Sequence, residues 1–130
     1  MILVDTHVVV WLACEAHRLS KNAKAAIRDA RNNGEGIAIS DISLLELSTL
    51  VSKGRVRLQI GLESFLQEVE ARLVVLPITG RVCARALRLP PNYPKDPADR
   101  IIGATALVEG LPLLTADREV RGSRAVRTVW

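Results

Sequence analysis

Aromatic residues and cysteines are scarce in this sequence. Only four of the 130 residues are aromatic: Trp11, Phe65, Tyr93 and Trp130. A platform of stacked aromatic rings for nucleic-acid bases is therefore not expected. The two cysteines, Cys14 and Cys83, have no C-x-x-C or histidine partner spacing. This excludes a zinc or disulfide framework and is typical of a reducing cytoplasm.

Long apolar runs are also absent. The longest, Val8–Cys14, is far shorter than the roughly 20 residues of a membrane-spanning helix. The first residues lack the basic start and small-residue cleavage site of a signal peptide. We therefore expect a cytoplasmic protein that does not contact the membrane.

The overall composition is that of a folded protein. Hydrophobic residues make up 48% of the chain and charged residues 25%, and 130 residues suffice for one domain spanning 1–130. The net charge is +4, and 14 of the 18 basic residues are arginine. This excess favours a polyanionic partner, although arginine richness is equally typical of an ordinary solvated surface.

Short apolar runs alternate with helical patterns along the chain. Strands are predicted at residues 2–4, 37–39, 73–76, 113–115 and 126–130. Helices are predicted at residues 6–14, 21–33, 42–53, 63–72, 79–89 and 96–109. The alternation predicts crossover connections and an α/β fold: a three-layer α/β/α sandwich around a parallel sheet of about five strands. In such sheets, ligands bind at the carboxyl ends of the strands.

Three aspartates are expected at that edge of the sheet. Asp5 directly follows the first strand, Asp99 lies in the first turn of the helix that Asp96 opens, and Asp117 is two residues beyond the fourth strand. Each also has a purely structural interpretation, because an aspartate at these places caps a helix or complements its dipole.

A fourth carboxylate, Glu46, is harder to explain structurally. On a helical projection its direction falls between Ile42 and Leu50, on the apolar side of the helix. Burying an unpaired carboxylate costs several kcal/mol, so a cation is needed there. A divalent metal is one candidate, and Lys53, two turns further on, is the structural alternative.

Converging carboxylates repel one another unless a cation lies between them. Oxygen ligands with no histidine or cysteine nearby select Mg²⁺ or Mn²⁺ rather than Zn²⁺, and such an ion assists attack of water on a phosphate. Gly103 and Ala106 are small enough to let their helix approach its neighbours around Asp99. An acidic metal pocket in a basic protein suits a phosphodiester backbone.

Four segments of the chain resemble the PIN-domain family, and within it the VapC-like toxins of toxin–antitoxin pairs. They are Ile2–His7, Ser43–Leu47, Asp96–Ala106 and Leu113–Asp117. The resemblance implies an endoribonuclease that cleaves RNA through metal-activated water, with Mg²⁺ as cofactor and Mn²⁺ as the alternative. It implies that the catalytic and metal-binding acids are Asp5, Glu46, Asp99 and Asp117.

The resemblance also assigns supporting roles and partners. Thr115 would position water or the scissile phosphate, and Thr6 is a weaker supporting candidate. Asp96 matches a family residue too, but its position as a helix cap explains it without a catalytic role. Relatives form homodimers and are silenced by a VapB-like antitoxin, so both partners are expected here.

Two other functions stay open at this point. One is a catalytically silent PIN-fold binding module, and the other is a phosphoacceptor or phosphatase domain built on Asp5. The latter needs a second acid beside Asp5 or two residues after it, where Thr6 and His7 stand. His7 is interpreted as a surface or packing residue rather than a general base. No glycine-rich phosphate loop is present, so no nucleotide cofactor is expected.

Overall fold

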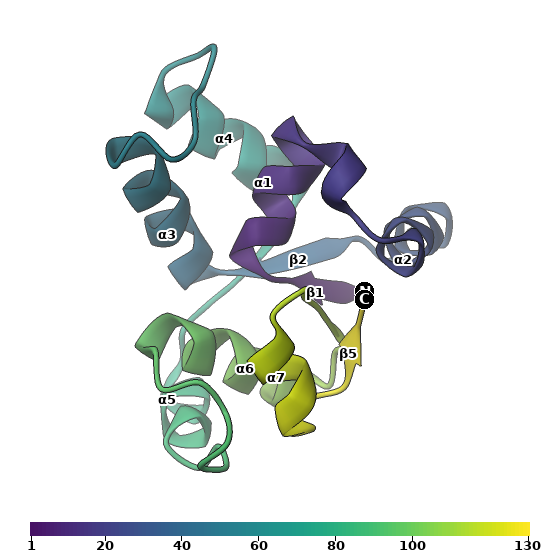
Figure 1. The fold of residues 1–130 in the computed structure, drawn as a ribbon, viewed down its shortest axis with the longest axis vertical. Helices are drawn as coiled ribbons and strands as arrows, with labels where there is room; N and C mark the ends of the chain where they lie inside the picture. The colour runs from purple at the N-terminus through teal and green to yellow at the C-terminus, as the bar shows by residue number, and fades with distance from the viewer.

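The protein is built around one parallel sheet of five strands. The computed structural model describes residues 1–130. The strands lie in the order β3-β2-β1-β4-β5, and every neighbouring pair is parallel. Their bounds are β1 Ile2–Val4, β2 Ile37–Ser40, β3 Val74–Leu76, β4 Leu113–Leu114 and β5 Thr128–Val129. The predicted three-layer α/β fold is confirmed (Figure 1).

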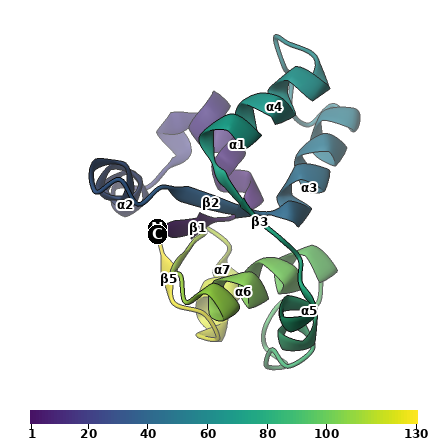
Figure 2. The ribbon, with the colours of Figure 1, turned by 180° about the vertical axis from the view of Figure 1, so that it is seen from behind.

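Helices cover both faces of the sheet. Figures 1 and 2 show α1, α3 and α4 on one side and α5, α6 and α7 on the other. The helix bounds are α1 Thr6–Cys14, α2 Lys21–Asn32, α3 Asp41–Ser52, α4 Leu62–Arg72, α5 Gly80–Ala86, α6 Pro97–Glu109 and α7 Arg118–Ser123, with a short 3₁₀ helix, η1, at Ala16–Arg18. None of them has the length and apolar character needed to cross a membrane.

Alternate residues of the central strand supply two separate cores. Ile2 and Val4 of β1 pack with Val8 and Leu47 on the side of α1 and α3, whereas Leu3 between them packs with the opposite layer. This is the period of two expected for a strand buried on both faces. The layers are therefore held by leucine, isoleucine, valine and alanine, with few aromatic rings.

Two predicted elements are too long, and one helix was missed. The helix capped by Thr79 ends at Ala86 rather than Leu89, because Leu87 starts a turn that leads to Pro90. The last strand is two residues long instead of five. Helix α7 was not predicted, because only one of its six residues, Val120, is buried and no apolar period marks it.

Candidate active site

Asp5 and Thr115 leave the sheet side by side. Val4 pairs with Leu114 in the β1–β4 register, so the next residue of each strand reaches the carboxyl edge together. The Thr115 hydroxyl donates a 2.7 Å hydrogen bond to Oδ2 of Asp5. The other carboxylate oxygen, Oδ1, accepts from the Thr6 amide at 2.8 Å and caps α1. Asp5 therefore caps a helix and presents a buried carboxylate at the sheet edge at the same time.

Glu46 reaches the same edge from α3. Its Oε1 accepts a 2.5 Å hydrogen bond from the Thr6 hydroxyl, which also lies 2.9 Å from Oγ of Ser43. Burial raises the pKa of the Glu46 carboxyl; the Thr6 hydrogen bond opposes this rise, and the negative charge of Asp5 adds to it. Lys53 makes no ion pair with Glu46, so the lysine alternative does not describe the structure.

Asp99 has the most perturbed carboxyl of the group. It lies in the first turn of α6, and its pKa is raised from 3.8 to about 7. Burial is the largest cause of this rise, and the charges of Asp5, Asp96, Asp117 and Glu46 contribute the rest in that order. Acids from four separate segments of the chain therefore lie close enough for their charges to affect the protonation of Asp99. A carboxyl perturbed by burial and like charges is typical of a functional site.

A buried tyrosine that the sequence analysis missed supports the backbone of Asp99. Tyr93 is 2% exposed, and its hydroxyl donates a 2.7 Å hydrogen bond to the Asp99 carbonyl oxygen. A Cβ atom on Gly103 would lie 2.7 Å from Cζ of that ring. The sequence analysis expected Gly103 to allow close approach of neighbouring elements around Asp99. The neighbour that occupies this space is the ring of Tyr93. Because the chain has so few aromatic residues, its single tyrosine was the sequence feature that could have pointed to this buried position.

Asp117 caps α7. Its Oδ1 accepts hydrogen bonds from the amides of Glu119 at 2.9 Å and Val120 at 3.0 Å. Its own amide donates to the Thr115 hydroxyl at 3.1 Å. The negative charge of its carboxylate raises the pKa of Asp99, so Asp117 acts on the site electrostatically.

His7 holds the loop between β4 and α7. Its Nε2 accepts a 3.0 Å hydrogen bond from the Ala116 amide, so the ring hydrogen is on Nδ1, which lies 3.7 Å from Oδ2 of Asp5. The ring also packs against Trp11 at 4.9 Å between centroids. The predicted packing role of His7 agrees with these contacts.

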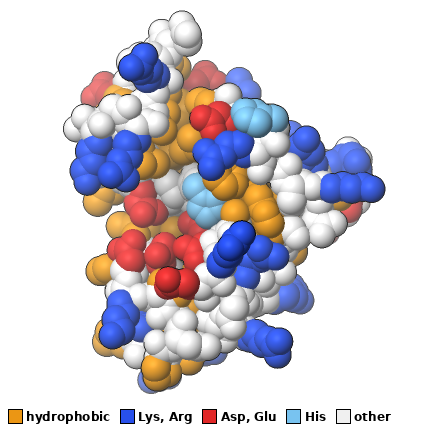
Figure 3. Space-filling view, viewed as in Figure 1, with side chains coloured by type: hydrophobic (Ala, Val, Ile, Leu, Met, Phe, Trp, Pro, Cys, Tyr) orange, Lys and Arg blue, Asp and Glu red, His pale blue; other side chains and the backbone are white.

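An open cleft of about 450 Å³ lies at this edge, between α3 and the start of α6. Acidic side chains gather beside it in Figure 3. Among the acids, Asp5, Glu46, Asp96 and Asp99 line the cleft, and two basic residues, Lys53 and Arg55, line it as well. Of the predicted site residues, Thr115 and Asp117 are outside the lining. Asp96 is inside it, although its side chain also caps α6.

The donors fit a divalent cation chemically, without forming a closed cage. No three acidic, histidine or cysteine side chains are arranged to hold one metal ion by themselves. Mg²⁺ is commonly bound through one or two carboxylates and keeps several of its waters, so a closed cage is not required. The carboxylates of Asp5, Glu46 and Asp99 and the hydroxyls beside them are hard oxygen ligands of the kind such ions prefer.

Comparison with known proteins identifies the class. The model of the family described as PIN domain matches residues 2–122. The chain therefore belongs to the PIN-domain family.

Within that family the chain is VapC-like. Ribonuclease VapC22 of Mycobacterium tuberculosis is 40% identical to it over 131 residues, covering 99% of this chain and 98% of the relative. Two solved structures share the fold. They are VapBC2 of Rickettsia felis bound to a DNA fragment from its promoter (TM-score 0.74, 20% identity, 98% and 97% of the two chains) and DNA-bound VapBC of Salmonella typhimurium (TM-score 0.67, 22% identity, 98% and 97%).

Proposed function

We propose that this protein is an endoribonuclease that hydrolyses RNA phosphodiester bonds at the cleft lined by Asp5, Glu46 and Asp99, with Mg²⁺ as its cofactor and Mn²⁺ as a substitute. The observation that carries the proposal is the convergence of these three carboxylates on one open cleft at the carboxyl edge of the sheet. The 40% identity to Ribonuclease VapC22 supports the same activity.

Each residue has a distinct role in this proposal. Asp5, Glu46 and Asp99 supply the carboxylates that hold the cation, and Asp117 adds negative charge from the start of α7. Thr115 orients Asp5 by donating to its Oδ2, and Thr6 orients Glu46 in the same way. A bound divalent cation would lower the pKa of water and neutralise charge on the phosphate.

The proposal includes a protein partner and a location. Relatives that share the fold were solved as VapBC complexes, which supports a VapB-like antitoxin as the inhibitor of this chain. We further propose that residues 1–130 act as one domain, that two copies form a homodimer, and that the protein works in the cytoplasm, where its RNA substrate is found.

The reaction can be tested through its products. Attack of water on the phosphorus with departure of the 3′ oxygen leaves a 5′-phosphate and a 3′-hydroxyl, whereas attack by the neighbouring 2′-hydroxyl leaves a 2′,3′-cyclic phosphate. We expect the first pair of ends from purified protein, RNA and Mg²⁺, and no cleavage in excess EDTA. Full activity in EDTA, or cyclic phosphate ends, would reject the mechanism. A protein that binds RNA or its partner without cleaving would instead be the silent binding module.

A further inference from the structure

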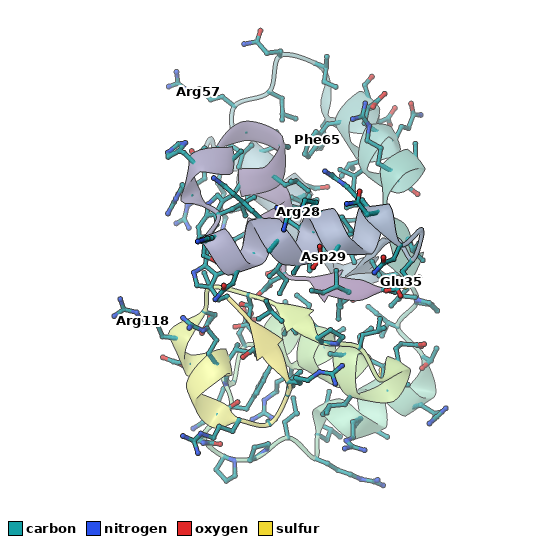
Figure 4. All side chains as sticks on the ribbon, turned by 90° about the vertical axis from the view of Figure 1, so that its right-hand side faces the viewer. Arg28, Asp29, Glu35, Arg57, Phe65 and Arg118 are labelled. Carbon is teal, nitrogen blue, oxygen red and sulfur yellow. The ribbon has the colours of Figure 1, made fainter.

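A basic segment borders the acidic cleft beside the end of α3. It comprises Lys53, Arg55 and Arg57, all of which are exposed. None of the three takes part in an ion pair. Figure 4 shows Arg57 extending to the same side of the molecule as Arg118, which is the face seen in Figure 3. Three positive charges that no acid neutralises therefore lie beside a cluster of carboxylates.

The end of α3 fixes the backbone of this segment. Gly54 adopts a left-handed conformation, with φ of +71°, and its amide donates to the Val51 carbonyl at 3.0 Å. The amide of Arg55 donates to the Leu50 carbonyl at 2.9 Å. These two bonds form a Schellman motif, which ends the helix and ties the residue after the glycine back to its last turn. Arg55 is therefore held beside Leu50, which itself lines the cleft.

Arg55 joins the cleft to a second cavity. It lines the acidic cleft of about 450 Å³ together with Lys53, and it lines a neighbouring cavity of about 320 Å³ together with Arg57. Arg55 therefore lies at the border of both hollows. The cleft is lined by the carboxylates, whereas the second cavity is lined by Arg55, Arg57 and a single acid, Glu15, which already pairs with Arg18.

The acidic cleft and the basic segment differ in what they can bind. Carboxylates repel a phosphate unless a cation intervenes, so the acidic cleft suits only the phosphate that reacts. The neighbouring phosphates of a strand need direct positive charge, and the planar guanidinium of arginine binds phosphate oxygens in pairs. We propose that Lys53, Arg55 and Arg57 bind the RNA backbone next to the cleaved phosphate. This inference rests on the proposed ribonuclease function.

The kinetics of single variants test it first. Because the segment holds the strand without touching the reacting phosphate, Arg55→Ala should raise KM roughly fivefold and change kcat by less than about twofold, as expected for an exposed charge contact. Arg55→Lys keeps the charge and should recover part of the loss. The matched control is Arg28→Ala, since Arg28 is an exposed arginine of α2 on another side of the molecule (Figure 4) and its side chain is 67% exposed. Equal KM values for Arg55→Ala and Arg28→Ala would overturn the proposal.

Binding without cleavage gives an independent readout. In an Asp99→Asn background with Mg²⁺, the affinity for a short fluorescein-labelled oligouridylate is measured by anisotropy at several salt concentrations. Each phosphate contact to a single strand contributes about 0.7 to the slope of log affinity against log salt. Replacing Lys53, Arg55 and Arg57 together by alanine should therefore make the slope shallower by about 2.

Three outcomes distinguish failure of the basic segment as an RNA site from failure of the proposed ribonuclease function. An unchanged slope in the triple variant rejects the basic segment as the RNA site. A loss of affinity for the VapB-like partner with unchanged RNA affinity also rejects it and assigns the segment to that partner. Wild-type protein that neither binds nor cleaves RNA rejects the proposed function itself, which the other two outcomes leave standing.

Discussion

The hydroxyl of Tyr93 donates a 2.7 Å hydrogen bond to the backbone carbonyl of Asp99, so a buried phenol holds the first turn of the helix that carries the most perturbed carboxyl of the site. The ring fits there because residue 103, one turn further along the same face, is a glycine.

Gly103→Ala should destabilise the fold because its new methyl group would collide with the Tyr93 ring. The collision is with an almost fully buried side chain, and overpacking of this kind costs about 1–3 kcal/mol. The measurement is chemical denaturation of the variant and the wild type. Gly80→Ala is the control, because a Cβ there meets nothing within 4 Å. Equal stability of Gly103→Ala and wild type would show that Tyr93 does not occupy this space.

Thr115→Val should lower cleavage while preserving the fold. Valine keeps the shape of threonine but removes the hydroxyl that donates to Asp5 and accepts from the Asp117 amide. We expect kcat to fall at least about tenfold, and stability to fall by about 1–3 kcal/mol because a polar partner is lost at a fully buried position. Thr115→Ser, which keeps the hydroxyl, should recover most of the activity. If Thr115→Val is as active as wild type, Thr115 does not orient Asp5 for catalysis.

The contribution of Asp99 to the stability of the metal-free protein should fall as pH rises from about 3.8 to about 7. Asp99 has a pKa of about 7 in the fold against 3.8 ordinarily, so the folded state binds the proton more tightly than the unfolded state. Stability decreases with pH wherever the folded state holds more protons. The measurement is the melting temperature across this interval in EDTA. Other groups titrate as well, so the decisive quantity is the melting temperature of wild type minus that of Asp99→Asn, which should decrease as pH rises. A difference that stays constant across the interval would show that Asp99 is not perturbed in the fold.

Glu46→Gln should raise the melting temperature of the metal-free protein and reduce the gain that Mg²⁺ provides. The glutamine carbonyl still accepts the Thr6 hydrogen bond, while the half-buried charge near Asp5 is removed. A ligand stabilises a protein in proportion to its preference for the folded state, so a weakened site gives a smaller shift. A variant that melts below wild type without metal and gains as much from Mg²⁺ would make Glu46 a structural residue.

Mg²⁺ and the proposed partner should compete. A cleft that accepts a cation also accepts a guanidinium, and the apolar side chains of Ile42, Leu45 and Leu50 lie beside the acids. We expect a basic residue of the partner to enter the cleft, so that affinity measured by calorimetry falls as Mg²⁺ increases. Affinity that is independent of Mg²⁺, with a bound complex that still cleaves RNA, would require inhibition at another surface.

The fold was predictable because its signals are local. The runs 2–4 and 37–39 are apolar throughout, as is typical of strands buried on both faces, and the helices between them begin at polar caps. The alternation of strands and helices then predicts crossover connections between parallel strands. Helix α7 escaped prediction because a six-residue helix with one buried side chain leaves no periodic signal.

The sequence predicted where the acids and the two threonines of the candidate site lie, but not the contacts of Tyr93 and His7. Asp5 follows the end of a strand and Asp99 lies in the first turn of a helix, and both placements are visible in the sequence. The contacts of Tyr93 with Asp99 and of His7 with Ala116 depend on how a loop folds back and on strand register, which neither spacing nor composition reports. The alternative for Glu46, a lysine partner, could be rejected only from the absence of an ion pair in the structure.

The proposed function requires that the clustered carboxylates carry out metal-dependent cleavage of RNA. The most direct measurement is the single-turnover cleavage rate of an RNA substrate at saturating Mg²⁺ for wild type, Asp99→Asn and Asp29→Asn. Asp29 is the control because its carboxylate is 66% exposed on α2, away from the cleft. We predict that Asp29→Asn cleaves at the wild-type rate and that Asp99→Asn, folded as judged by circular dichroism, loses at least about a hundredfold, as removal of a group that stabilises the transition state does. Equal rates for folded Asp99→Asn and wild type would mean that the cleft around Asp99 does not carry out the cleavage.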